Sequence, residues 1–197
     1  MLSADLKART RPHHDAAEAS PAMQAVMSDG LTRDVYRDHL ARLLAFYAPA
    51  ESALAGVAGL AGVVPDLDAR LVKADWLRED LAALGAEAPG PEAPASPAPV
   101  APFDVARALG ALYVIEGSTL GGRLIARHLE RTLGVSAHAG ARFYLSYGDE
   151  RGERWTALKQ ALDRYGADHP GQADLVVASA ADTFDALRTQ MDASLAA

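Results

Sequence analysis

The sequence predicts an all-α fold, and three observations support that prediction. Alanine, leucine, arginine and glutamate are abundant while β-branched residues are sparse, which is a composition that favours helices. Apolar residues recur at steps of three and four through much of the chain. Turn-forming residues separate these segments, and no segment carries a strand signal. With 197 residues, half of them hydrophobic, the chain is long enough to bury a sizeable core.

The composition also argues against several classes of function. The absence of cysteine excludes disulfides, thiolate metal sites and thiol catalysis. A formal net charge of −7 argues against a nucleic-acid partner. No apolar run approaches the roughly 18 residues that span a membrane, and the polar, amphipathic first residues do not resemble a signal peptide. We therefore expect a soluble, cytoplasmic protein with one domain over residues 1–197.

The first helical segment contains a proline, which leaves its shape open. Ser3 can cap its start, and the segment extends to Ala19. Pro12 lacks a backbone donor and crowds the carbonyl four residues earlier. Either the helix kinks there, or Thr10 caps a second helix with Pro12 in its first turn, where proline is tolerated.

Three further helices are predicted before residue 85, each beginning at a residue that can cap a helix. The long central one is expected to bend at Pro49 and to continue through an alanine-rich run. The predicted starts are Ser20-Pro21, Thr32 and Asp66-Leu67, and the predicted ends are Asp29-Gly30, Gly62 and Leu84.

Residues 85–102 differ from the rest of the chain. They hold six prolines among alanine, glycine and glutamate, which excludes a helix. A domain linker is one interpretation. We favour a surface loop, because neither half of the chain alone predicts a closed helical bundle.

The second half predicts three long helices. Asp104 caps the first, which Gly134 ends. The second begins near Gly152, and the last covers residues 172–195. Between the first two, residues 137–147 have no clear period and are predicted to be a short helix or loop that packs aromatic side chains inward. The chain therefore predicts about seven helices.

Three glycines interrupt the helix that starts at Asp104. Gly117, Gly121 and Gly122 each cost roughly 1 kcal/mol relative to alanine, or about 3 kcal/mol together. Their spacing leaves a strip of bare backbone on one helix face. The strip has two interpretations: it contacts a large flat ligand, or it lets another helix pack closely.

The common catalytic motifs are absent. The six histidines form neither a His-Glu-x-x-His nor a Glu-x-x-His pair, so a non-haem metal site has little support. Ser118 does not lie in a nucleophile elbow and has no evident base. What remains is a histidine near the N-terminus and a glycine-rich helix. An axial imidazole with bare backbone opposite is one way to hold haem, although a lone histidine is more often structural.

Two motifs resemble haem oxygenases, and bacterial members in particular. Residues 6–18 match the family pattern Leu-(Arg/Lys)-x-x-Thr-x-x-x-His-x-x-x-Glu, which places the iron ligand at His14 rather than His13. Residues 116–122 match the Glu-Gly-Ser-x-Leu-Gly-Gly core of the family's distal helix. Residues 142–148, 154–155 and 181–184 are also similar, so the resemblance spans nearly the whole chain. It implies a single-domain, multi-helix bundle of the haem oxygenase type.

The resemblance implies an activity. Haem, held between the two helices, would be both cofactor and substrate. The implied reaction would use O₂ and electrons to hydroxylate one meso carbon and to open the ring to biliverdin, with release of CO and Fe²⁺. An external donor such as a ferredoxin or a flavin reductase would supply electrons. The resemblance implies two uses of the reaction: it would supply biliverdin to a photoreceptor, or it would recover iron from haem.

The resemblance also implies roles for individual residues. His14 ligates the iron, and Glu18, one turn later, hydrogen-bonds around it. Lys7 matches a basic residue that pairs with a haem propionate, although its spacing alone fits a solvated surface lysine equally well. Further residues expected to contact haem are Thr10, Tyr113, Arg154 and Lys159. The expected catalytic wall is Gly117, Ser118, Gly121 and Gly122.

One departure from the family concerns the residue after the first glycine. Many members have an aspartate in the distal helix that orders a proton-delivering water, whereas this chain has Ser118. A serine hydroxyl can hold water but lacks a carboxylate's charge, so proton delivery is unassigned. Two alternatives to the enzyme follow. One is a haem-binding protein without turnover, and the other is a helical protein of this fold that binds no haem.

Overall fold

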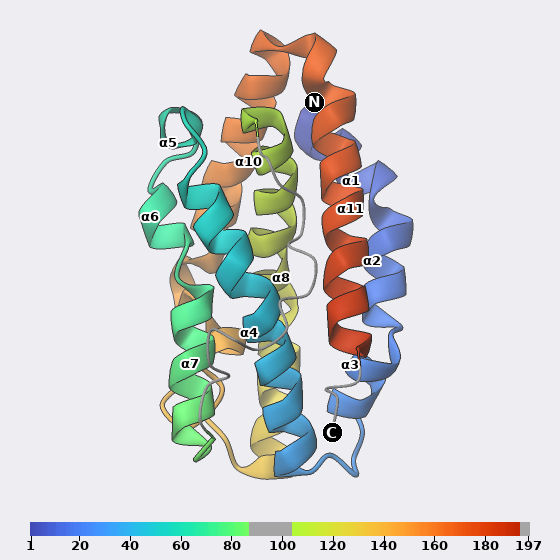
Figure 1. Ribbon diagram of the computed structural model, residues 1–197, viewed down its shortest axis with the longest axis vertical. Coiled ribbons are helices and arrows are strands. Elements are labelled where there is room, and N and C mark those ends of the chain that lie inside the picture. The colour runs from blue at the N-terminus through green and yellow to red at the C-terminus, as the bar shows by residue number, and fades with distance from the viewer. Residues whose placement is uncertain (87–103, 194–197) are drawn as a thin grey trace.

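The computed structural model describes residues 1–86 and 104–193, which form an all-helical bundle without a strand (Figure 1). The all-α prediction is thus confirmed. The α-helices of the described residues are α1 (Leu2–Arg9), α2 (Arg11–Glu18), α3 (Pro21–Val26), α4 (Arg33–Ala55), α5 (Leu60–Val63), α6 (Leu67–Arg70), α7 (Lys73–Ala83), α8 (Val105–Leu133), α9 (Arg142–Leu145), α10 (Arg151–Asp168) and α11 (Ala173–Asp192). Two short 3-10 helices, η1 (Gly148–Glu150) and η2 (Pro170–Gln172), precede α10 and α11.

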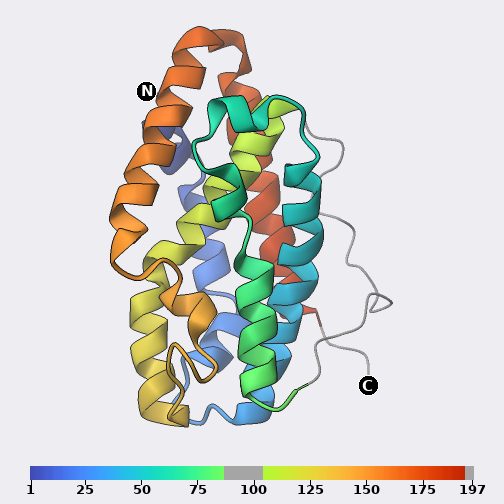
Figure 2. The ribbon, with the colours of Figure 1, turned by 90° about the vertical axis from the view of Figure 1, so that its left-hand side faces the viewer.

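Helix α8 is the central element. Figure 1 shows it between α4 and α7 on one side and α11, α1 and α2 on the other. Figure 2 shows α10 flanking α8 on the side opposite α4. Buried apolar side chains from both halves of the chain form one core around α8. Of the described helices, none is long and apolar enough to cross a membrane.

The N-terminal segment breaks at Thr10. Helix α2 begins directly after Thr10 with Pro12 in its first turn, which is the second of the two predicted arrangements. The Thr10 hydroxyl does not cap α2, since it donates to the Leu6 carbonyl at 2.7 Å. Ser3 was expected to cap the segment, but Met1 occupies that position, and the Ser3 hydroxyl donates to Asp163. The break gives α2 its own direction.

Two predicted long helices are each divided. Helix α4 runs through Pro49 as expected but ends at Ala55, and a separate α5 follows Gly59, whose φ of 86° is left-handed. The helix expected from Asp66 to Leu84 is split into α6 and α7. Apolar spacing continues across both gaps, so the pattern alone does not reveal these breaks. They account for part of the difference between about seven predicted helices and the larger number observed in the described residues.

The second half follows the prediction closely. The Asp104 carboxylate accepts the Arg107 N–H at 2.8 Å and so caps α8, which ends at the left-handed Gly134. Residues 137–147 contain the short helix α9, whose Phe143 and Tyr144 are buried. Of the proline-rich residues 85–102, all but the first two lie outside the described residues, as does the predicted end of the last helix at residue 195.

Gly110 explains how closely α8 and α11 approach. A Cβ at Gly110 would lie 2.3 Å from the Val176 carbonyl oxygen and 2.8 Å from the Ala180 nitrogen. Only glycine lets the two backbones meet at this crossing. This contact fixes α11 against α8, and therefore fixes one wall of the cavity described next.

Candidate functional site

A cavity of about 570 Å³ lies between α2 and α8, and α4, α9, α10 and α11 contribute to its walls. Its volume is in the range of small-molecule sites. Apolar and aromatic side chains form most of the walls, and a few polar groups face the same space. The apolar part of the lining is Ala17, Met23, Leu43, Leu120, Ile125, Phe143, Trp155, Phe184, Leu187 and Met191.

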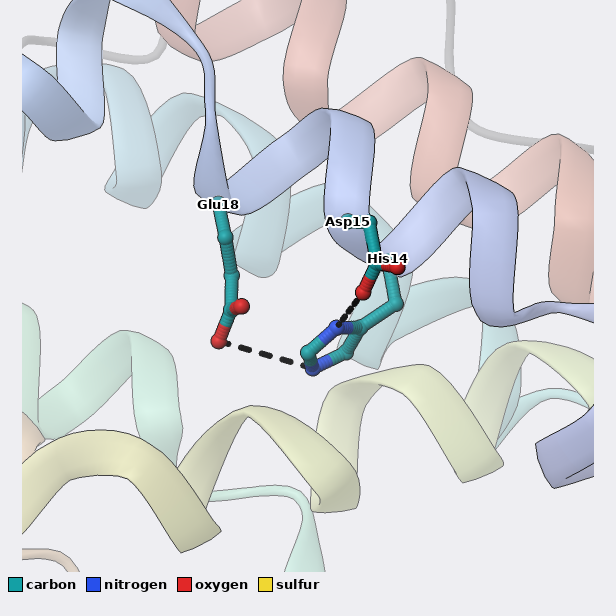
Figure 3. Close-up of side chains that lie close together, drawn as sticks. All are labelled: His14, Asp15 and Glu18. Carbon is teal, nitrogen blue, oxygen red and sulfur yellow. Dashed lines mark hydrogen bonds and ion pairs between the residues drawn. The ribbon is translucent and has the colours of Figure 1, made fainter.

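His14 projects from α2 into the gap that faces α8 (Figure 3). Its Nδ1 lies 3.4 Å from Asp15 Oδ1, and its Nε2 lies 3.7 Å from Glu18 Oε1. Phe184 of α11 meets the ring edge-on, with 5.8 Å between the ring centroids. The side chain is 48% exposed, so a ligand can reach it from the cavity.

His13 has different surroundings. Its Nδ1 lies 3.1 Å from Asp185 Oδ2 of α11, and it does not line the cavity. Although they are adjacent on α2, His14 faces the cavity and His13 contacts α11. Of the two, His14 is the one that lines the cavity.

The three glycines of α8 have different surroundings. Gly117 and Gly121 line the cavity. A Cβ on Gly121 would meet nothing within 4 Å, and one on Gly117 would touch only the Trp155 ring, at 3.6 Å. A Cβ on Gly122 would lie 1.9 Å from the Tyr144 carbonyl oxygen. The close-packing interpretation therefore applies to Gly122, which allows α9 to pack, while Gly117 and Gly121 line a cavity.

Ser118 is the polar centre of the α8 wall. Its hydroxyl donates to the Ile115 carbonyl at 2.7 Å and accepts from the Tyr47 hydroxyl at 2.8 Å. Burial raises the pKa of Tyr47, so this phenol stays protonated. A hydroxyl pair therefore stands at this part of the α8 wall.

The structure brings most of the predicted contact residues to the cavity. Lys7, Thr10, Glu18, Tyr113 and Lys159 all line it, from α1, α2, α8 and α10. Lys7 and Lys159 give it two ammonium groups, and the guanidinium of Arg11 also lines it.

Arg154 and Gly122 are not in the cavity wall. Arg154 stacks on the Tyr147 ring, 4.6 Å from its centroid, and bonds to Glu150 at 3.0 Å. Gly122 lies under the backbone of Tyr144. Neither residue is therefore positioned to touch a ligand in this cavity.

Among the polar residues of the cavity lining that the sequence analysis missed are three from α4 and α9: His39, Tyr47 and Tyr144. Tyr47 and His39 lie at helical spacing on α4, where they are indistinguishable from core residues in the sequence. Tyr144 lies in a segment without a clear period. Only the folded chain brings the three together.

Glu116 precedes the glycine strip and is held in a buried charge cluster. Its carboxylate pairs with Arg70 Nη1 at 2.5 Å and with Lys73 Nζ, and it accepts the Tyr147 hydroxyl at 2.8 Å. All three charged side chains are at most 2% exposed. Burial lowers the pKa of Lys73. The cluster joins α6 and α7 to α8 one residue before Gly117, and so fixes the helix that carries the cavity wall.

His39 makes the stability of the fold sensitive to acid. Burial lowers its pKa from an ordinary value of 6.5 to about 4. Between these values the unfolded chain binds the proton more readily, so the contribution of neutral His39 is complete above about pH 6.5 and is lost as the pH falls toward 4. The full effect is about 3 kcal/mol.

We expect wild-type apoprotein to lose about 2–3 kcal/mol more stability than His39→Gln between pH 7 and pH 4.5. Urea unfolding at both pH values measures this. The comparison with the variant is needed because burial also raises the pKa of Asp80, to about 6. Protonation of Asp80 stabilises the folded state of both proteins as the pH falls, so the comparison cancels its effect. Equal losses in the two proteins would contradict the assignment.

The cavity suits a flat macrocycle with an iron at its centre. The His14 imidazole stands on one side, and bare helix backbone lies opposite with open space above Gly121. The walls are largely apolar, and two lysines are available for carboxylate groups at the edge. Fold and site together define an all-α protein with a cavity between a histidine and a glycine-rich helix, and the cavity is suited to one flat ligand.

Comparisons with known proteins identify the family. The model of the family described as Heme oxygenase matches residues 1–193. The chain therefore belongs to the haem oxygenase family, whose reaction is the degradation of haem. The resemblance found in the sequence is thereby confirmed.

Solved structures show the same fold. The NO- and CO-bound haem oxygenase of Neisseria meningitidis is 23% identical with a TM-score of 0.75, over 100% of this chain and 95% of that one. The Leptospira interrogans enzyme is 20% identical with a TM-score of 0.74, over 97% and 98% of the two chains. A Synechocystis enzyme in complex with haem is 18% identical with a TM-score of 0.72, over 97% and 90%. A comparison with curated proteins gave no match.

Proposed function

We propose that the chain binds haem between α2 and α8 and cleaves it to biliverdin, CO and Fe²⁺. The observation that carries this proposal is the opposition of His14 to the bare backbone of Gly117 and Gly121 across one cavity. When bound, haem supplies the redox and O₂ chemistry and is itself the substrate. The protein binds it, orients it, excludes water and delivers protons.

His14 Nε2 is the nitrogen proposed to ligate the iron, because it lies on the side of the ring that faces α8 (Figure 3). Glu18 lies 3.7 Å from this nitrogen and must withdraw when the iron binds. Nδ1 then stays directed toward Asp15, which fixes the ring orientation.

The edge of the cavity is proposed to hold the propionates. Lys7 and Lys159 are the cationic groups at α1 and α10, and ion pairs from both would set the rotation of the ring in its plane. Thr10 and Tyr113 complete this side of the contact surface. Rotation in the plane decides which meso carbon faces the α8 wall.

The α8 wall is proposed to admit a bound diatomic ligand. Gly117 and Gly121 leave no side chain to block it, and the Ser118–Tyr47 hydroxyl pair offers hydrogen bonds nearby. Electrons would come from an external donor such as a ferredoxin or a flavin reductase, which fits a cytoplasmic enzyme. The biliverdin would pass to a bilin-binding photoreceptor or be discarded after iron recovery.

Two steps test the proposal. Hemin added to the purified protein should give a one-to-one complex with the absorption spectrum of histidine-ligated haem. Reduction of this complex in air, by ascorbate or by a ferredoxin system, should replace that spectrum with the bands of biliverdin and release CO. Failure to bind hemin would support the helical protein without haem. A complex that survives reduction in air would support a haem-binding protein without turnover.

Gly121→Ala separates the requirements of folding from those of haem binding. We expect the apoprotein to gain up to about 1 kcal/mol, because alanine favours the helix and its methyl group meets no atom within 4 Å. The same methyl group projects where the ring would lie, so hemin affinity should fall. Urea unfolding and hemin titration measure the two effects.

Gly122→Ala is the matched control one residue away. Its methyl group would collide with the Tyr144 carbonyl, so the apoprotein should lose about 1–3 kcal/mol from overpacking. If both variants were equally stable, the division of the glycines between cavity and packing would be wrong.

A further inference from the structure

The hydrogen bonds of Tyr47 and Ser118 run in one direction. The Tyr47 hydroxyl donates to Ser118 Oγ at 2.8 Å, and the Ser118 hydroxyl donates to the Ile115 carbonyl at 2.7 Å. A hydroxyl has one proton and two acceptor lone pairs, so both protons of the pair are already used. Both residues line the haem cavity, and what they still offer to it is lone pairs. In this respect the pair resembles a carboxylate, which accepts hydrogen bonds and donates none.

The surroundings fix the positions of both hydroxyls. Tyr47 is 1% exposed, and its ring meets the Phe143 ring edge-on, with 5.2 Å between the centroids. Ser118 lies on α8 between Gly117 and Gly121, the two glycines of the cavity wall. Burial raises the pKa of Tyr47, so the phenol keeps its proton and the direction of the hydrogen bonds is maintained. The free lone pairs therefore have a fixed place beside the bare backbone.

A water molecule is suited to acceptors of this kind. It donates one hydrogen to the pair and keeps a second hydrogen, which it can direct into the cavity. Leu120 and Gly121 line the same cavity and are exposed, so water from the solvent can enter there. When the water gives up its second hydrogen, a proton from the solvent replaces it through the same opening. Neither hydroxyl has to change its charge.

We propose that Ser118 and Tyr47 together hold one water whose free hydrogen points at a diatomic ligand on the haem iron. The proposal rests on the proposed function, and it assigns the proton delivery that Ser118 alone leaves open. The proton comes from the water and is replaced from the solvent. Ser118 and Tyr47 act through this water, so both are positioning residues.

The first test follows the ferric haem complex without turnover. As the pH rises, a water bound to ferric haem loses a proton, and the absorption spectrum changes from an acid to an alkaline form. Acceptors that reach this ligand through the held water stabilise the acid form. Tyr47→Phe and Ser118→Ala should therefore lower the midpoint by about 0.5–1 pH unit, the size expected for the loss of one hydrogen bond. Ser118→Asp supplies a charged acceptor and should raise the midpoint.

The second test measures biliverdin formation in single-turnover experiments, alongside hemin affinity. Tyr47→Phe and Ser118→Ala should slow the reaction by about tenfold or more, with hemin affinity unchanged, because the water is no longer positioned. Ser118→Asp should keep most of the wild-type rate, since a carboxylate also accepts without donating. Tyr36→Phe is the matched control. It removes another buried phenol, whose hydroxyl donates to the Gly140 carbonyl at 2.7 Å, and should leave midpoint and rate at wild-type values.

Several results would overturn the proposal. An unchanged midpoint in Ser118→Ala would exclude the water site, and this variant decides the point even if the buried Tyr47→Phe folds poorly. A lower midpoint in Ser118→Asp would contradict the role of the pair as acceptors. Shifted midpoints with wild-type rates would exclude the water from proton delivery. Wild-type protein that binds hemin but forms no biliverdin would remove the proposed function, whereas the midpoints would still decide the water site.

Discussion

Alanine at position 14 is expected to abolish histidine-type haem binding. His14 is the histidine of α2 that faces the cavity, and the described cavity lining contains one other, His39, whose Nε2 is held by Tyr144. Loss of an outer-shell partner already weakens metal sites by 10–100-fold, so loss of the ligand itself should weaken hemin binding by at least about 100-fold. Hemin titration followed by absorption, with EPR of the ferric complex, measures this.

His13→Ala is the matched control, since it changes the neighbouring residue in the same way. His13 pairs with Asp185 and lies outside the cavity, so the variant should keep both the spectrum and the hemin affinity. If the histidine-type spectrum persisted in His14→Ala and disappeared in His13→Ala, the ligand assignment would be wrong.

Glu116→Ala is expected to lower the free energy of unfolding by about 3–5 kcal/mol. The change leaves Arg70 and Lys73 buried without their counter-charge, at 1% and 0% exposure. Such a loss is a large part of the roughly 5–15 kcal/mol that stabilises a typical domain. Urea unfolding of the apoprotein measures it.

Glu150→Ala is the control for the removal of a glutamate from an ion pair. Glu150 is 67% exposed and pairs with Arg154 at 3.0 Å, so its loss should cost under about 1 kcal/mol. Similar losses in the two variants would mean that the buried cluster does not anchor α8.

Much of the fold could be predicted from local signals. Caps at Thr32 and Asp104, the Ser20-Pro21 start and the Gly134 stop all appear as expected, because each depends on residues next to one another in the chain. The division of α6 from α7 could not be predicted. It lies beside Arg70 and Lys73, whose partner Glu116 is more than 40 residues away in sequence.

For the candidate site too, local motifs could be predicted from the sequence and long-range contacts could not. The motif around His14 and the glycine strip were visible in the sequence, and His14, Gly117 and Gly121 line the cavity. The spacing of the glycines could not show that Gly122 packs against Tyr144, since that contact depends on where α9 lies. The pairing of His39 with Tyr144 joins positions 105 residues apart and has no local signal.

The most direct test of the central claim is a crystal structure of the protein with hemin. The structure should show the iron bound to Nε2 of His14, with the macrocycle against the backbone of Gly117 and Gly121. Haem ligated by another residue, or bound outside the cavity between α2 and α8, would contradict the account.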